Sequence, residues 1–223
     1  MEQATTFVAK PMVGIGIAMA FIVIAGLLSA LFFGGSEANM IVVAAAVFGA
    51  YMAVNIGAND VANNMGPAVG ANALTMGGAI LIAAIFESAG ALLAGGDVVS
   101  TISKGIIDSS VIDNSRVFIW AMMAALISSA IWVNLATWVG APVSTTHSVV
   151  GGVMGAGVAA AGFAAVNWNT MGAIAASWVI SPMLGGIVAA MFLALIKSQI
   201  IYKEDKLAAA RLWVPILVAI MAA

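Results

Sequence analysis

The chain has 223 residues and a formal net charge of -2; 64% of its residues are hydrophobic and only 7% are charged. A soluble domain carries about 25% charged residues, so this composition excludes an ordinary soluble protein and predicts an integral membrane protein. The chain has no cysteine, which excludes disulfides and thiolate chemistry. The sequence also lacks a basic run typical of nucleic-acid binding, so we expect no nucleic-acid partner.

Apolar runs of helix length follow one another along the sequence. One membrane-spanning helix needs roughly 20 predominantly apolar residues. By this measure we expect spanning helices at residues 12–33, 40–57, 76–96, 116–139 and 170–196. A sixth apolar run begins near Leu212 and stops before it could cross the bilayer, so we expect that the chain is part of a longer protein.

These runs predict three segments. Residues 1–39 form an N-terminal extension with a spanning helix of its own. Its apolar stretch Pro11–Ser36 exceeds the roughly 7–15 residues of a signal-peptide core, so we expect a retained helix; cleavage near "FFGGSEA" is the alternative. Residues 40–211 form the main unit, and residues 212–223 begin a further helix.

Two stretches carry residues that interrupt helices. Residues 58–75 contain Pro67, Asp60 and several glycines and asparagines, and residues 140–162 begin with Gly-Ala-Pro. Broken backbone at membrane depth is tolerated where it is buried in protein or lines an aqueous cavity, and secondary transporters build their sites in this way. We therefore predict that residues 58–75 and 140–162 form two non-continuous helices that meet near the bilayer midplane. Ordinary kinks or short loops are the alternative.

Basic residues are concentrated in one connecting segment. Residues 197–211 contain four of them, whereas the loop 97–115 contains only Lys104. An excess of Lys and Arg favours the cytoplasmic side, so this pattern predicts a cytoplasmic position for 197–211.

Asp60 and Glu87 are the only acidic residues within the apolar runs. A carboxylate at membrane depth usually marks a transport pathway or a charge pair, and no Lys or Arg accompanies these two. Asn59 and Asn63 lie on the same helical face as Asp60 and offer amide oxygens, which suit Na⁺ or a proton better than a soft metal. The alternatives are that Asp60 caps a half-helix with Asn59, and that Glu87 is protonated and hydrogen-bonded between helices.

A second polar cluster follows in "APVSTTHS". Pro142 suits the first turn of a helix, which would place Ser144, Thr145 and Thr146 around the helix N-terminus. Helix N-termini bind anions because their N–H groups lack partners and the dipole is positive there. His147 is the only histidine, and one histidine is too little for a metal site. It is either a packed hydrogen-bond donor or a functional group. One cluster thus suits a cation and the other an anion, which together predict cation-coupled anion transport.

The same stretches resemble the inorganic phosphate transporter (PiT) family. The resemblance rests on three segments found in order between about Asn55 and Gly157: "GANDVANNMGPAVGANALT", "AAIFESAGALLAGGDVVSTISKGII" and "GAPVSTTHSVVGGVMGAG". It implies symport of inorganic phosphate with Na⁺ or H⁺, and two inverted repeats, each with a GANDVAN-type signature and a re-entrant hairpin. The signature falls on residues 57–63 and the hairpin tip on residues 144–146. The chain departs from the family pattern in Asn64, in its additional N-terminal helix and in the lack of a second GANDVAN.

The expected fold is an all-α, polytopic helical bundle, one half of an inverted-repeat transporter. We assign substrate binding to Asn63, Ser144, Thr145 and Thr146, and cation binding to Asn59, Asp60 and Asn63. Glu87 is a candidate proton or cation relay. No cofactor is expected beyond the coupling ion, and the expected partners are phosphate, the lipid bilayer and a missing C-terminal repeat, with a homodimer left open. The expected location is the cell (inner) membrane, as a multi-pass protein.

Three alternative functions are left open. A permease of the same family could carry sulfate or another oxyanion, since some members move sulfate. An anion channel would use the same hydroxyl cluster without coupling. An intramembrane enzyme would use Asp60 and Glu87 as an acid–base pair, but these carboxylates lie on separate predicted helices with no metal-ligand set.

Overall fold

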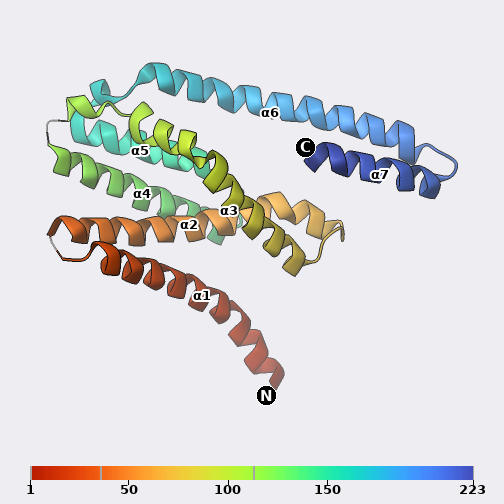
Figure 1. Cartoon of the computed structure of the whole chain (residues 1–223), viewed down its shortest axis with the longest axis horizontal. Coiled ribbons are helices and arrows are strands. Elements are labelled where there is room, and N and C mark those ends of the chain that lie inside the picture. Colours follow the sequence, from red (N-terminus) through yellow and green to blue (C-terminus); the bar gives the residue numbers. More distant parts are fainter. Residues whose placement is uncertain (1, 36, 113, 223) are drawn as a thin grey trace. The chain divides into compact units, whose positions relative to one another are not determined.

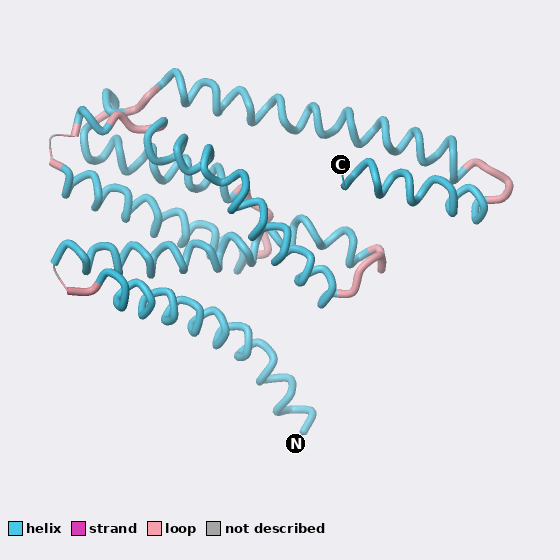
Figure 2. Tube along the Cα trace, viewed as in Figure 1, coloured by secondary structure: helices cyan, strands magenta, loops and turns pink. Residues whose placement is uncertain are grey.

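The computed structural model describes residues 2–35, 37–112 and 114–222, and no strand is found within these ranges. Short loops join the helices (Figure 2). The α-helices are α1 (Glu2–Phe33), α2 (Glu37–Gly70), α3 (Met76–Ser100), α4 (Ser115–Trp138), α5 (Thr145–Ala161), α6 (Trp168–Ile196) and α7 (Lys206–Ala222) (Figure 1). The chain divides into two compact units, Met1–Trp168 and Asn169–Ala223.

Five of these helices are long and apolar enough to cross a membrane. They comprise Met12–Phe33, Met40–Gly70, Met76–Gly105, Ser115–Trp138 and Trp168–Ile201. Each contains one of the apolar runs expected from the sequence; only the run 116–139 extends one residue beyond its helix, which ends at Trp138. Large apolar side chains such as Leu92 and Leu93 are almost fully exposed, which fits a surface that faces lipid. The expected all-α, polytopic fold is confirmed.

Helices α2, α4 and α5 pack together and form the centre of the first unit. Met52 of α2 lies in a buried cluster with Ala130 and Val133 of α4. Small residues allow α4 and α5 to approach closely, because a Cβ added at Gly152 of α5 would collide with the hydroxyl of Ser129. This packing places the last turn of α4 and the first turn of α5 beside the middle of α2.

The predicted interruption of residues 58–75 is wrong for most of its length. Helix α2 continues through the whole signature and includes Pro67. It ends only at Gly70, and two residues later Asn72 adopts a left-handed φ of 57°. The N–H groups of Asn72 and Ala73 donate to the carbonyls of Val69 and Ala68, at 3.0 and 2.9 Å, which is the hydrogen-bond pattern of a Schellman helix end. Asp60 therefore lies inside a helix, and the alternative that it caps a half-helix is also wrong.

The predicted interruption of residues 140–162 is confirmed at its beginning only. Helix α4 ends at Trp138 and α5 then runs unbroken from Thr145 to Ala161. Gly140 has a φ of +72°, and the N–H groups of Gly140 and Ala141 donate to carbonyls of the last turn of α4, again as in a Schellman motif. Pro142 lies in the connecting loop, so the expectation that it occupies the first turn of the next helix is wrong. A re-entrant position of this hairpin in the bilayer stays a prediction.

The second unit consists of most of α6, a π-helical turn at Lys197–Ile201, a short loop and α7. Helix α7 begins at Lys206, earlier than the expected start near Leu212, because Asp205 caps it: the N–H of Ala208 donates to the Asp205 carboxylate at 2.9 Å. The charged segment 197–211 thus combines a helix end, a turn and a helix start.

Candidate substrate and coupling-ion site

The signature asparagines form a row along one face of α2. Asn55, Asn59 and Asn63 are spaced by four residues, which places them above one another on the helix. The amide nitrogen of Asn63 donates to the side-chain oxygen of Asn59 at 3.1 Å. The expectation that Asn59 and Asn63 are neighbours on one face is therefore confirmed, whereas Asp60, which was expected on the same face, is adjacent to Asn59 in sequence and accepts from α5 instead.

This row faces the C-terminal part of α4. Asn59 is buried, and its amide nitrogen donates to the hydroxyl of Thr137 at 3.0 Å and to the carbonyl of Ala141 at 3.4 Å. One turn earlier, the amide nitrogen of Asn134 donates to the side-chain oxygen of Asn55 at 2.8 Å. These hydrogen bonds fix α2 against α4. The side-chain oxygens of Asn55 and Asn59 each accept one hydrogen bond in the row and keep one lone pair for a further ligand.

Asn134 and Thr137 were not predicted as part of the site. Both are polar residues in the apolar run 116–139. Their spacing of three residues would place them on one helical face, which could have marked that face as polar. Nothing in the sequence, however, indicates that this face of α4 meets the signature.

Asp60 is directed at the other predicted cluster. The hydroxyl of Thr145, the first residue of α5, donates to the Asp60 carboxylate at 2.8 Å. Thr145 is only 6% exposed, so this hydrogen bond lies within the packed region of the first unit. The structure thus joins the expected cation residue and one of the expected anion residues, although 85 residues separate them in sequence.

Ser144, Thr145 and Thr146 lie at the N-terminus of α5, as the sequence predicts. Ser144 is the N-cap, and its hydroxyl oxygen accepts the N–H of His147 at 3.2 Å. The side chains of Ser144, Thr146 and His147 are exposed in this unit. The hydroxyl of Ser148 donates to the Ser144 carbonyl at 2.8 Å, which further fixes the turn. Thr145 and Thr146 therefore present hydroxyl groups at the positive end of the helix dipole.

A cavity of about 260 Å³ adjoins the asparagine row. Its walls include Asn59 and Asn63 from α2, Thr137 from α4, and Pro142 from the connecting loop. Pro67 adds a further acceptor in this part of α2: it has no N–H group, so the carbonyl of Asn63 lacks its ordinary helical donor. Amide, hydroxyl and backbone oxygens thus line this cavity, next to the turn of α2 that carries Asp60.

Glu87 lies apart from these residues. It is exposed on α3 and contributes to a largely apolar cavity of about 800 Å³ between α2 and α3. Within the described ranges its carboxylate forms no hydrogen bond or ion pair with another residue, so the alternative of an interhelical hydrogen bond finds no support. The structure does not bring Glu87 to Asp60, and its role as a relay stays a prediction.

Comparison with known proteins decides the family. The model of the phosphate transporter family matches residues 56–223, which include the signature, the hairpin and the second unit. The chain belongs to the phosphate transporter family. The predicted resemblance is confirmed, and with five membrane-capable helices the chain is a multi-pass integral membrane protein.

Relatives of this family agree over much of the chain. A protein of Helicobacter pylori named "Putative phosphate permease" is 54% identical over 220 residues, covering 99% of this chain and 41% of that protein. A protein of the same description from Pyrococcus abyssi is 45% identical over 170 residues, covering 76% of this chain and 42% of that protein. A solved structure entitled "The sodium-dependent phosphate transporter" has a TM-score of 0.72 and 42% identity, and covers 77% of this chain and 42% of its own. The chain spans about two fifths of the length of these proteins.

Proposed function

We propose that the protein is a secondary transporter that couples the movement of inorganic phosphate to Na⁺. The hydrogen bond between Thr145 and Asp60 is the observation that carries the proposal, because it joins a carboxylate to the hydroxyl-rich N-terminus of α5. The similarity to a sodium-dependent phosphate transporter favours Na⁺ over H⁺ as the coupling ion. The present chain would supply one part of the site, and a second, inverted repeat would supply the rest.

Asp60 is the proposed centre of the cation site. Hard cations such as Na⁺ bind oxygen ligands, and this part of α2 offers a carboxylate, the amide oxygens of Asn59 and Asn63, and the Asn63 carbonyl left free by Pro67. Among the described residues no three His, Cys, Asp or Glu side chains cluster as a metal site, so one carboxylate with neutral oxygens is the available donor set. A single positive ion matches a single negative charge at this depth.

The N-terminus of α5 is the proposed anion site. Thr145, Thr146 and Ser144 carry hydroxyl groups, and the first N–H groups of α5 lack helical acceptors. Hydrogen bonds to a charged group are worth roughly 1.5–3 kcal/mol each, so several neutral donors can replace part of the hydration shell of phosphate. Asn63 would contribute its amide to the same anion from the side of α2.

Coupling follows from the distance between these two sites. An unneutralised Asp60 repels phosphate and also holds the hydroxyl of Thr145, at 2.8 Å. A cation bound to Asp60 would cancel the repulsion and weaken the hold on Thr145, which could then donate to phosphate. Phosphate would thus bind well only with the cation in place, and this positive coupling between the two ligands is what symport requires.

Uptake by the full-length protein in proteoliposomes tests the proposal. We expect radiolabelled phosphate to accumulate when an inward Na⁺ gradient is imposed and to equilibrate only slowly without it. Accumulation driven by a proton gradient alone would replace Na⁺ by H⁺ in the proposal. Gradient-independent flux would indicate a channel, absence of flux would fit the enzyme alternative, and preferential uptake of sulfate would assign a different oxyanion.

A further inference from the structure

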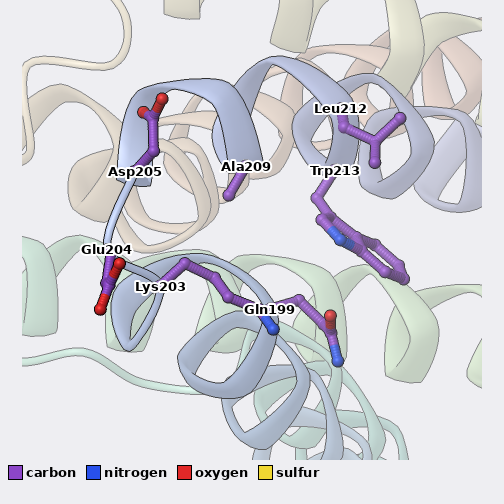
Figure 3. A pocket seen from close by; sticks show the side chains of 7 residues that line it. All are labelled: Gln199, Lys203, Glu204, Asp205, Ala209, Leu212 and Trp213. Carbon is purple, nitrogen blue, oxygen red and sulfur yellow. The ribbon is translucent and has the colours of Figure 1, made fainter.

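The second unit contains a crevice that the transport proposal does not use. It has a volume of about 460 Å³ and lies between the turn that follows α6 and the beginning of α7. Figure 3 shows the indole of Trp213 reaching from α7 towards the end of α6, where Gln199 and Lys203 lie side by side. Glu204 and Asp205 point away from the indole in the same view. The crevice is thus lined by the nitrogen donors of Gln199 and Lys203, by Glu204 and Asp205, whose carboxylates are turned away from the indole, and by an apolar, aromatic wall of Ala209, Leu212 and Trp213.

The end of an apolar span beside the crevice indicates a position at the level of the lipid headgroups. The candidate membrane span of α6 extends over Trp168–Ile201, and Lys203 follows it directly. On the other side, α7 is apolar from Leu212 to its end, so the crevice opens where the candidate span of α6 ends and the apolar part of α7 begins. Trp213 and Tyr202, the residue before Lys203, are of types that are enriched at this interface.

The charge of the segment is positive and partly unneutralised. Residues 197–211 contain the four basic residues Lys197, Lys203, Lys206 and Arg211 and two acidic residues, Glu204 and Asp205. Asp205 is used as the cap of α7 through the N–H of Ala208. In the part of the chain that the structure describes, Lys203 forms no ion pair, so its ammonium group is available to an anion that enters the crevice.

We propose that this crevice binds the headgroup of an anionic phospholipid. The lipid phosphate would accept from the ammonium of Lys203 and the amide of Gln199, while the glycerol and first acyl carbons would contact Leu212 and Trp213. Basic pockets beside membrane helices bind anionic headgroups in this way. Free inorganic phosphate could use the two donors but would gain nothing from the apolar wall, so the lipid is the occupant that matches both walls.

Native mass spectrometry of the full-length protein tests this site. The detergent-solubilised protein is titrated with dioleoyl phosphatidylglycerol and, separately, with dioleoyl phosphatidylcholine. We expect tighter binding of phosphatidylglycerol, and a loss of about five-fold in its affinity for Lys203→Gln, since one basic residue near anionic lipid is worth that factor. Lys203→Arg keeps the charge and should restore most of the affinity, which separates loss of the site from misfolding. The matched control is Lys104→Gln, which removes a lysine of the first unit and should leave the affinity unchanged.

A second pair of measurements separates the lipid from free phosphate. Trp213→Ala removes the apolar wall and should weaken phosphatidylglycerol binding, whereas Trp213→Phe should preserve it. Inorganic phosphate added as a competitor should displace little of the bound lipid. Equal binding of the two lipids, an unchanged affinity in Lys203→Gln, or complete displacement by inorganic phosphate would each overturn the proposal.

Discussion

The signature in α2 and the loop between α4 and α5 have similar composition but different backbones. Both are rich in small residues, and both contain a proline, Pro67 in one and Pro142 in the other. The signature is nevertheless continuous helix, while the loop turns the chain around. In the loop, Gly140 adopts a left-handed conformation and closes a Schellman motif before the proline. In α2 the corresponding motif forms only at Asn72, after the proline.

The comparison shows that a left-handed residue, and not the density of glycine and proline, marks where these helices end. It also bears on the proposed division of roles between a cation site and an anion site. A continuous α2 holds Asp60 and the asparagine row in fixed register, whereas the turn before α5 leaves N–H and hydroxyl groups without helical partners. The rigid element suits a charge-matched cation and the open helix end suits an anion.

The largest expected effect comes from the charge in α2. Asp60→Asn should abolish gradient-driven phosphate uptake by the full-length protein while leaving membrane insertion intact, because the only charge of the signature is lost. Uptake in proteoliposomes against Na⁺ concentration measures this. Asp97→Asn, an exposed acid-to-amide change at the end of α3, serves as the matched control and should retain uptake. Normal uptake by Asp60→Asn with its Na⁺ dependence intact would assign Asp60 a structural role.

A smaller effect is expected from Thr145, whose hydroxyl donates a hydrogen bond to Asp60. Thr145→Val removes the hydroxyl from α5 and should raise the half-saturating phosphate concentration about ten-fold, since a hydrogen bond to a charged group is worth roughly 1.5–3 kcal/mol. The half-saturating Na⁺ concentration should not rise, because the hydroxyl competes with the cation for Asp60. Thr145→Ser should restore phosphate affinity, and Ser128→Ala on the exposed side of α4 should change neither value. An unaltered phosphate dependence in Thr145→Val would remove the hairpin from the anion site.

The backbone difference itself can be tested with one substitution in each region. Gly140→Ala places a side chain at a φ of +72° and should destabilise the protein by about 1–2 kcal/mol. Gly66→Ala lies in helical α2, where an added Cβ meets no atom within 4 Å, and should stabilise by up to about 1 kcal/mol. Thermal unfolding of the two full-length variants in detergent measures both. Equal shifts in the same direction would contradict the distinction between the two regions.

The smallest effect concerns a carboxylate outside the membrane-spanning segments. Asp108 accepts the hydroxyl and the N–H of Ser110, at 2.6 and 2.9 Å, and these hydrogen bonds lower the pKa of Asp108 below its ordinary 3.8. A lowered folded-state pKa favours the charged form, so its contribution to stability is present above pH 3.8 and is lost as the pH falls through the folded-state pKa. Because Asp108 is fully exposed, the effect should be slight. Asp108→Asn should flatten this part of the pH–stability curve. An unchanged acid slope would show that the hydrogen bonds from Ser110 to Asp108 have no influence on stability.

Sequence patterns alone determined the membrane class, the five spanning helices and the neighbouring positions of Asn59 and Asn63. These features depend on local quantities: the length of an apolar run and the four-residue spacing of a helix. The position of Ser144, Thr145 and Thr146 at a helix N-terminus was also predicted, although the sequence placed the helix start earlier, at Pro142, and did not identify Ser144 as the N-cap. The resemblance that points to phosphate came from the same local segments.

Only the tertiary structure decided which helix breaks and what the polar residues contact. The end of α2 depends on backbone hydrogen bonds around Asn72, which residue composition does not reveal. The partners of the signature, Asn134, Thr137 and Thr145, come from distant parts of the chain, and they meet it because α4 and α5 pack against α2 through small side chains. Helix packing fixes such contacts through the shapes of whole surfaces, so a pattern within one segment could not specify them.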